Sequence, residues 1–187
     1  MNMKKIVLAS GSPRRREILK RAGLEFEIHP SNYEEVLDNH DFTPEKIEKL
    51  AYNKALDVAN ELDEKAVIIG ADTVVVLNNE ILTKPHDRED AFKMLKSLSG
   101  VEHHVVTGIC VIDKYDDVTK IEAVTTTVEF ENLTDEQINY YIDNYKPFDK
   151  AGAYGIQELP DGFVKRVDGS LENVIGLCSK TVLAMLD

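Results

Sequence analysis

The stretch Ala66-Val-Ile-Ile-Gly-Ala-Asp-Thr-Val-Val-Val-Leu77 organises the rest of the chain. Its length and its apolar, β-branched composition predict a buried strand. Asp72 and Thr73 are its only polar side chains. A buried carboxylate is costly unless it is hydrogen-bonded, paired with a cation or bound to a metal. We therefore favour a functional role for Asp72 over the alternative, a structural aspartate that ties down a neighbouring turn.

Strands and amphipathic helices alternate on both sides of this run. The order of elements combines crossover units with hairpins, which predicts an α/β fold with a mixed, twisted sheet flanked by helices. No linker or repeat divides the chain, so we expect one domain over residues 1–187. Strands are expected at 5–9, 26–29, 66–77, 80–82, 103–113, 121–130 and 163–167, and helices at 13–22, 44–62, 88–100, 134–145 and from 172 onward. Ser12, Thr43 and Asp87 are expected to cap the first three helices, and Thr134 and Gln137 to form a capping box at the fourth.

Composition excludes several classes of protein. The 187 residues include 34 acidic and 22 basic side chains, a net charge of −12, which disfavours non-specific binding to nucleic acid or to an anionic membrane. No apolar stretch approaches the length of a membrane span, and the one after Lys5 is too short for a secretory signal. Cys110 and Cys178 are far apart and form no paired motif. We therefore expect a cytoplasmic protein without a disulfide framework.

Three arginines crowd the start of the first helix, in Ser10-Gly-Ser-Pro-Arg-Arg-Arg16. A helix start already carries positive partial charge, so this pattern favours an anion bound there, with the hydroxyl of Ser12 and free N–H groups nearby. The spacing from Arg14 to Ile18 places Arg14 on the inward face of the helix, whereas Arg16 faces solvent. For Arg14 and Arg15 we favour phosphate binding over the alternative of a solvated basic turn.

Three further sites break local rules. Lys54 lies within an apolar helix stripe, where it either extends its ammonium to solvent or reaches a pocket to meet a carboxylate or phosphate; the spacing favours neither. Lys84 is held by Pro85 just before a helix, and its alternative is a solvated loop lysine. The loop from Asp149 to Gln157 has two glycines that permit close approach to a ligand, and Gln157 can complement a base edge. The alternative for this loop is a tight structural turn.

Together these motifs resemble, in order and over nearly the whole chain, the Maf-like nucleotide pyrophosphatase family. The resemblance implies the fold of inosine-triphosphate pyrophosphatases, with helices around a deep cleft. It also implies a cytoplasmic, usually dimeric enzyme that cleaves nucleoside triphosphates to monophosphate and pyrophosphate with a divalent cation. The segments that carry the resemblance are Leu8–Arg15, Gly70–Thr73, Lys84-Pro85, Ser99-Gly100, Asp149–Gln157 and Asn173–Leu177.

The resemblance also implies a role for each matching residue. Asp72 falls on the position of the family's proton acceptor. Arg14, Thr73 and Gln157 fall on the positions that mark the branch acting on thymidine and uridine triphosphates. The residues that match other positions of the cleft are Ser10, Arg15, Glu35, Lys54 and Lys84.

These assignments lead to a hypothesis for the reaction. Glu35 and Asp72 are the candidate ligands of Mg²⁺ or Mn²⁺, and Asp72 accepts a proton from, or orients, a water that attacks the α-phosphorus. Whether Asp72 is base, ligand or both stays open. Thr73 and Gln157 are expected to contact the pyrimidine edge. The alternatives are a house-cleaning hydrolase of modified nucleotides and a nucleotide-binding module in division arrest.

Overall fold

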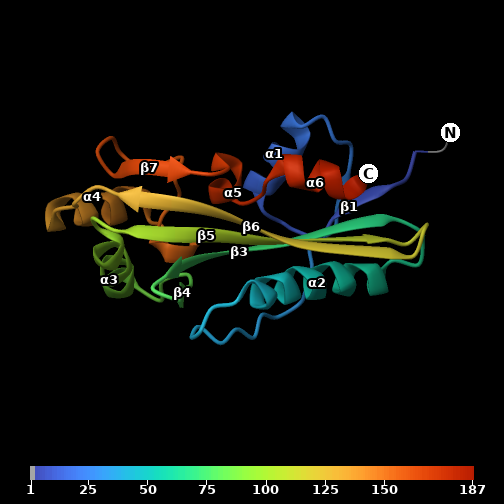
Figure 1. Cartoon of the computed structure of the whole chain (residues 1–187), viewed down its shortest axis with the longest axis horizontal. Coiled ribbons are helices and arrows are strands. Elements are labelled where there is room, and N and C mark those ends of the chain that lie inside the picture. The colour runs from blue at the N-terminus through green and yellow to red at the C-terminus, as the bar shows by residue number, and fades with distance from the viewer. Residues whose placement is uncertain (1–2) are drawn as a thin grey trace.

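A seven-stranded sheet runs the length of the molecule in the computed structural model, which describes residues 3–187 (Figure 1). Its strands follow the order β2-β1-β3-β5-β6-β7, and β4 pairs with β3 outside this path. The strands are β1 (Ile6–Leu8), β2 (Glu27–Ile28), β3 (Val67–Leu77), β4 (Glu80–Leu82), β5 (Glu102–Asp113), β6 (Val118–Phe130) and β7 (Val164–Asp168). The helices are α1 (Pro13–Arg21), α2 (Pro44–Glu61), α3 (Arg88–Leu98), α4 (Asp135–Tyr145), the 3-10 turn η1 (Ala151–Ala153), α5 (Leu171–Ile175) and α6 (Ser179–Leu186).

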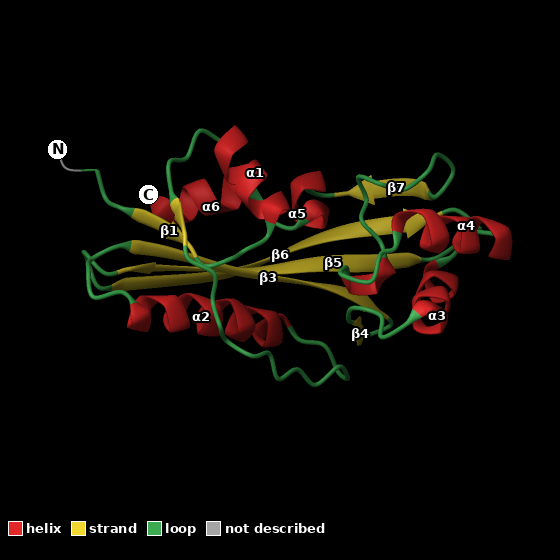
Figure 2. Ribbon diagram, turned by 180° about the vertical axis from the view of Figure 1, so that it is seen from behind, coloured by secondary structure: helices red, strands yellow, loops and turns green. Residues whose placement is uncertain are grey.

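The sheet is mixed, as the sequence predicts. β1 runs parallel to β2 and to β3, whereas β3, β5, β6 and β7 form an antiparallel ladder. Helix α2 covers one face, and α1, α5 and α6 cover the other (Figures 1 and 2). The register places Asp72 of β3 opposite Gly108 of β5, near the middle of the long ladder.

Two glycines let α2 approach the sheet closely. A Cβ atom built on Gly70 would lie 2.5 Å from the carbonyl oxygen of Ala51 in α2, and one on Gly108 would also collide with the α2 backbone, at Ile47. Because neither strand carries a side chain there, the helix backbone rests directly on β3 and β5. This contact brings Lys54 of α2 to the level of Asp72.

One end of the sheet has its own apolar cluster, which is covered by α3, α4 and η1. Its largest buried side chains are aromatic and aliphatic residues from β6, the segment before β7, and both helices: Phe130, Phe163, Tyr141, Leu95, Leu98 and Ile138. At the opposite end, α1 and α6 pack on a second cluster that includes Leu8, Leu19 and Val182.

Most expected elements are present, with three differences. The expected closing helix is two short helices, because Gly176 adopts a φ of +148° and ends α5. Strand β6 begins at Val118, not at residue 121. The side chain of Thr43 makes no capping hydrogen bond. The caps at Ser12 and Asp87 and the capping box of Thr134 and Gln137 are confirmed.

Candidate functional site

A cavity of about 540 Å³ opens between the two apolar clusters. This volume is within the range of small-molecule sites, roughly 300–1,000 Å³. Its wall is built by the start of α1, the segment before α2, the middle of α2 and β3, the loop after β4, the loop around η1 and the end of α5. The sequence-predicted site residues on this wall are Ser12, Arg14, Arg15, Glu35, Lys54, Asp72, Thr73, Lys84 and Gln157.

Lys54 joins two carboxylates at the base of the cavity. Its Nζ lies 2.5 Å from Oε1 of Glu35 and 3.4 Å from Oδ1 of Asp72. The lysine side chain is 16% exposed, so its ammonium is turned to the site and not to bulk solvent. Of the two alternatives for Lys54, the structure supports a cation that meets carboxylates at the pocket.

Asp72 is the most buried acid of the site, with 8% of its surface exposed. Its Oδ1 accepts a hydrogen bond from the backbone N–H of Thr73 at 2.9 Å. Its Oδ2 is buried and has no hydrogen-bond partner within the described residues 3–187. Asp72 lines the cavity, and a buried carboxylate oxygen without a partner calls for a ligand, a cation or a water molecule that the surrounding protein groups do not supply.

The pKa values of the two carboxyl groups are shifted in opposite directions. Burial raises the pKa of Asp72 above its usual range, and the charge of Glu35 adds to this, against the opposing charges of Lys54 and Arg15. Burial also raises the pKa of Glu35, but the hydrogen bond and charge of Lys54 and the charge of Lys84 outweigh it, and the net pKa lies below its usual range. Neighbouring acids with separated pKa values are typical of acid–base sites.

Arg15 is held inside the protein beside the cavity. Its Nε donates to the carbonyl of Gly176 at 2.8 Å, and its terminal nitrogens donate to Thr73 Oγ1 at 3.0 Å and to Ser10 Oγ at 3.3 Å. Ser10 is therefore a support for Arg15 and is absent from the residues that line the cavity. The hydrogen bond from Arg15 to Gly176 depends on the end of α5 at Gly176, where the chain turns and the carbonyl of Gly176 meets the arginine of α1.

Thr73 is similarly engaged. Besides Arg15, its Oγ1 contacts Thr107 Oγ1 at 2.8 Å and the carbonyl of Gly176 at 3.2 Å. A hydroxyl offers one donor and two acceptor positions, so these three contacts use all of them. A contact between Thr73 and a pyrimidine edge would have to displace one of these protein contacts.

The start of α1 carries the expected anion-binding features. Ser12 Oγ accepts from the N–H of Arg15, which caps the helix, and both Ser12 and Arg14 face the cavity. Lys84 lies across the cavity with Pro85. The described site thus places two free cationic side chains, Arg14 and Lys84, and one helix N-terminus around the carboxylates.

The loop from Tyr154 to Gln157 is anchored from below by aromatic hydroxyl groups. Tyr141 Oη accepts from the N–H of Gly155 at 3.0 Å, and Tyr154 Oη lies 2.6 Å from Nε2 of the buried His103. Burial lowers the pKa of His103 to about 4, so the imidazole is neutral at pH 7. The loop that carries Gln157 is therefore held in place by hydrogen bonds that involve two tyrosine side chains.

Sequence reasoning missed three residues near this loop. Lys150 and Glu158 line the cavity, and their charged groups lie 3.5 Å apart beneath Gly155. Lys150 belongs to the loop from Asp149 to Gln157 that the sequence analysis selected, so its position in that loop could have identified it. His103 could not be identified in this way, because its neighbour His104 is exposed on the same strand and the sequence does not show which of the two is buried.

The donor set fits a weakly ligated divalent cation. Among residues 3–187 no group of three or more His, Cys, Asp or Glu side chains is arranged to hold a metal by itself. Glu35 and Asp72 supply two carboxylates, and Oδ2 of Asp72 has no hydrogen-bond partner within residues 3–187. Mg²⁺ is commonly held by one or two carboxylates together with substrate phosphates and waters. The residues present fit that mode.

The model of the family described as Maf-like protein matches residues 5–187. The chain belongs to the Maf family. Two relatives named dTTP/UTP pyrophosphatase come from Ruminiclostridium cellulolyticum, 48% identical over 94% of this chain and 91% of its own, and from Acetivibrio thermocellus, 49% identical over 94% and 90%. A third, from Clostridium perfringens, is 47% identical over 92% and 91%.

Among solved structures, the Ham1 protein of Staphylococcus aureus superposes with a TM-score of 0.54 at 17% identity, over 98% of each chain. This likeness confirms the expected α/β fold class. Within the described residues of this Maf-family chain, no helix is both long enough and apolar enough to cross a membrane.

Proposed function

We propose that this Maf-family protein hydrolyses dTTP and UTP to the monophosphate and pyrophosphate. The observation that carries the proposal is the buried Oδ2 of Asp72, which has no partner within residues 3–187; Asp72 lines a nucleotide-sized cavity that is also lined by cationic side chains. The identity of 47–49% to enzymes named dTTP/UTP pyrophosphatase, over more than nine-tenths of this chain, supports the choice of substrates.

The cationic wall binds the triphosphate. Arg14 and Lys84 contact phosphate oxygens, and the N-terminus of α1 with Ser12 adds hydrogen-bond donors. Arg15 contributes its charge from behind, because its guanidinium is committed to Gly176, Thr73 and Ser10. This local positive field offsets the net charge of −12 for a small anion.

Asp72 acts on the water nucleophile. The water oxygen forms a bond to the α-phosphorus while the bond from that phosphorus to the oxygen bridging the β-phosphorus breaks, and pyrophosphate leaves with that oxygen. The proton of the water passes to the carboxylate of Asp72, and the raised pKa of this group suits it to accept one. Lys54 keeps Asp72 and Glu35 in place between turnovers.

A divalent cation, Mg²⁺ or Mn²⁺, would be held by Glu35 and Asp72, and when bound it neutralises part of the triphosphate charge. Gln157 donates to and accepts from the pyrimidine edge, at the end of the anchored loop. Thr73 fixes Arg15 and adds to base recognition only if a nucleotide displaces one of its contacts.

We further propose that the protein is cytoplasmic and forms a homodimer. Both cysteines, Cys110 and Cys178, are buried and unbridged, which suits a reducing compartment.

The test is product analysis with a panel of nucleotides. The purified protein and its Asp72→Asn variant are incubated with Mg²⁺ and each canonical triphosphate, with methylated and other modified triphosphates beside them, and pyrophosphate is measured. The proposal predicts the highest kcat/KM for dTTP and UTP and a large loss in the variant. Higher kcat/KM for modified nucleotides supports the house-cleaning alternative, and binding without turnover supports a nucleotide-binding module.

A further inference from the structure

The outer edge of β6 is only partly covered. β7 pairs with β6 from Thr127 to Phe130. From Val118 to Thr126 no other strand of the described chain, residues 3–187, pairs with this edge. The five residues Val118–Glu122 are all exposed. A long unpaired strand edge is a template for pairing with another chain.

Strand parity restricts how such a pairing can form. The N–H of Phe130 donates to Val101, on the β5 side, whereas the N–H of Glu131 donates to Phe163, on the β7 side. Because the ladder of β5 and β6 is regular, even-numbered residues of β6 direct their backbone groups to β5 and odd-numbered residues direct theirs outward. Two copies related by a two-fold axis can therefore bond only through odd residues, so Ile121 can pair with Ile121 of the second copy.

Charge selects one of the allowed registers. With the axis at Ile121, Lys120 of each copy stands beside Glu122 of the other, and Val118 stands beside Val124. An axis at residue 120 or 122 would instead place Lys120 beside Lys120, or Glu122 beside Glu122, which is unfavourable. Neither Lys120 nor Glu122 has an ion-pair partner within residues 3–187, so both charges are available. The segment Val-Thr-Lys-Ile-Glu-Ala-Val is thus complementary to itself in antiparallel orientation.

We propose that two copies of this chain pair along β6, antiparallel, about a two-fold axis at Ile121. Pairing joins the two sheets into one and satisfies the outward N–H and C=O groups of Thr119, Ile121 and Ala123. It also covers Val118 and Ile121, each 43% exposed. Ala123 packs towards α2 and Val124 towards the cluster of α1 and α6, so the two sheet faces both continue across the axis.

Charged residues on an edge strand can also serve to prevent pairing. Charged residues prevent pairing when residues of the same sign would face one another in every register of the two strands. Here the two signs flank Ile121 and match when the axis lies at this residue, which is one of the registers that backbone parity allows. This inference specifies the surface of the homodimer proposed above. It does not depend on the cleft or on any substrate, so it can fail while the proposed activity stands.

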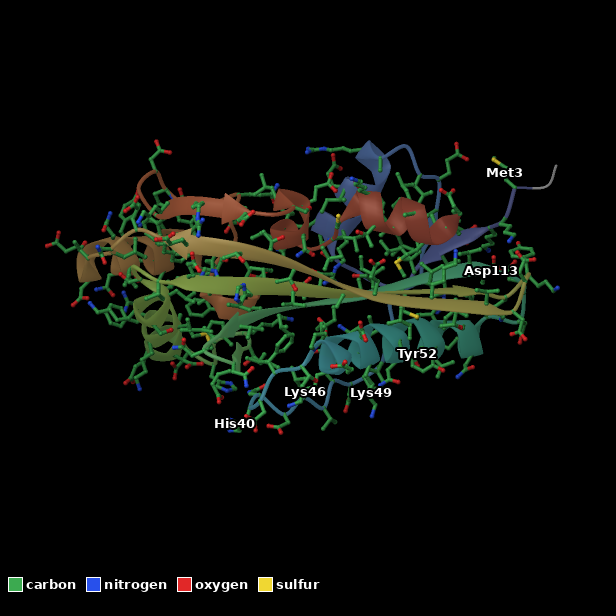
Figure 3. All side chains as sticks on the ribbon, in the orientation of Figure 1. Met3, His40, Lys46, Lys49, Tyr52 and Asp113 are labelled. Atoms are coloured by element: carbon green, nitrogen blue, oxygen red, sulfur yellow. The ribbon has the colours of Figure 1, made fainter. Side chains whose placement is uncertain are left out.

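Charge reversal tests the register. Sedimentation velocity at 1–50 µM, roughly the range over which specific dimers form, is run without nucleotide on the unaltered protein, Lys120→Glu, Glu122→Lys and the double variant. We expect a dimer for the unaltered protein, at least about tenfold weaker association for each single variant, and recovery in the double variant, which restores opposite charges. Lys49→Glu is the matched control, since Lys49 projects from α2 away from the sheet (Figure 3), and it should stay dimeric.

Ile121→Pro gives a second, independent arm. The N–H of residue 121 faces outward, so proline removes no bond to β5 and the fold is retained. The expected product is a folded monomer with an unchanged thermal transition at matched concentration, corrected for the dimer contribution. A monomeric unaltered protein, single variants that associate normally, or a double variant that fails to recover would each overturn the proposal.

Discussion

His103 makes the stability of this protein depend on pH in a predictable way. The imidazole is 1% exposed, with Nε2 against the hydroxyl of Tyr154 and Nδ1 unpartnered within residues 3–187. Burial, and to a smaller extent the neighbouring His104, lowers its pKa from 6.5 to about 4. The unfolded chain therefore binds one more proton than the folded one between these values. Stability from this group is complete above pH 6.5 and is lost as pH falls towards 4.

The magnitude follows from the size of the shift. At pH 4.5 the histidine of the unfolded chain lies two units below its pKa, which corresponds to a loss of about 2.5 kcal/mol relative to pH 7.5. His103→Gln removes the titration and keeps a polar group near Tyr154. Other titrating groups cancel when the two proteins are compared at each pH.

Urea unfolding measures the effect. The free energy of unfolding is determined for the unaltered protein, His103→Gln and the exposed control His104→Gln at pH 7.5, 6.0 and 4.5. The difference between the unaltered protein and His103→Gln should shrink by about 2.5 kcal/mol as pH falls, because only the former takes up the extra proton on unfolding. The His104→Gln control keeps His103 buried and should therefore keep most of this pH dependence. A constant difference for His103→Gln would refute a buried, neutral imidazole.

Three further predictions follow from the site and from the contact of α2 with the sheet. Gln157→Ala should change the ratio of kcat/KM for dTTP to that for dCTP by about tenfold or more, since a lost polar contact to the base costs roughly 1–3 kcal/mol; an unchanged ratio would remove Gln157 from base recognition. Lys54→Gln should shift the acid limb of the pH–rate profile to higher pH, because Lys54 lowers the pKa of Asp72, and a limb at the same pH would exclude Lys54 from that role. Gly70→Ala should destabilise the fold by about 1–3 kcal/mol in thermal unfolding, since its Cβ would collide with Ala51, whereas Gly11→Ala, with 3.7 Å to Pro30, should cost much less; equal effects would contradict the close helix contact.

Local patterns predicted the elements whose residues carry their own signals. The apolar run around Asp72 is β3, and the caps at Ser12, Asp87 and Thr134 lie where their side chains indicate. Helix ends that depend on a single backbone angle were harder to predict. The end of α5 at Gly176 was missed, because a glycine within a helical pattern does not specify its own φ.

The site residues likewise divide into those that local patterns predicted and those that depend on how distant segments meet. Lys54 and Asp72 stood out because each charge lies within an apolar pattern, and the structure brings them within 3.4 Å. The engagement of Thr73 with Arg15 and Thr107 was not predictable, because it depends on how three distant segments meet. The pairing of His103 with Tyr154 is of the same kind.

The rate of pyrophosphate release from dTTP by the unaltered protein and by Asp72→Asn, measured with Mg²⁺ in ¹⁸O-labelled water, tests the central claim most directly. Water attack on the α-phosphorus aided by Asp72 predicts ¹⁸O in the thymidine monophosphate and a rate at least about 10²-fold lower in the variant, the usual contribution of a general base. Label in the pyrophosphate, or near-normal turnover by Asp72→Asn, would contradict it.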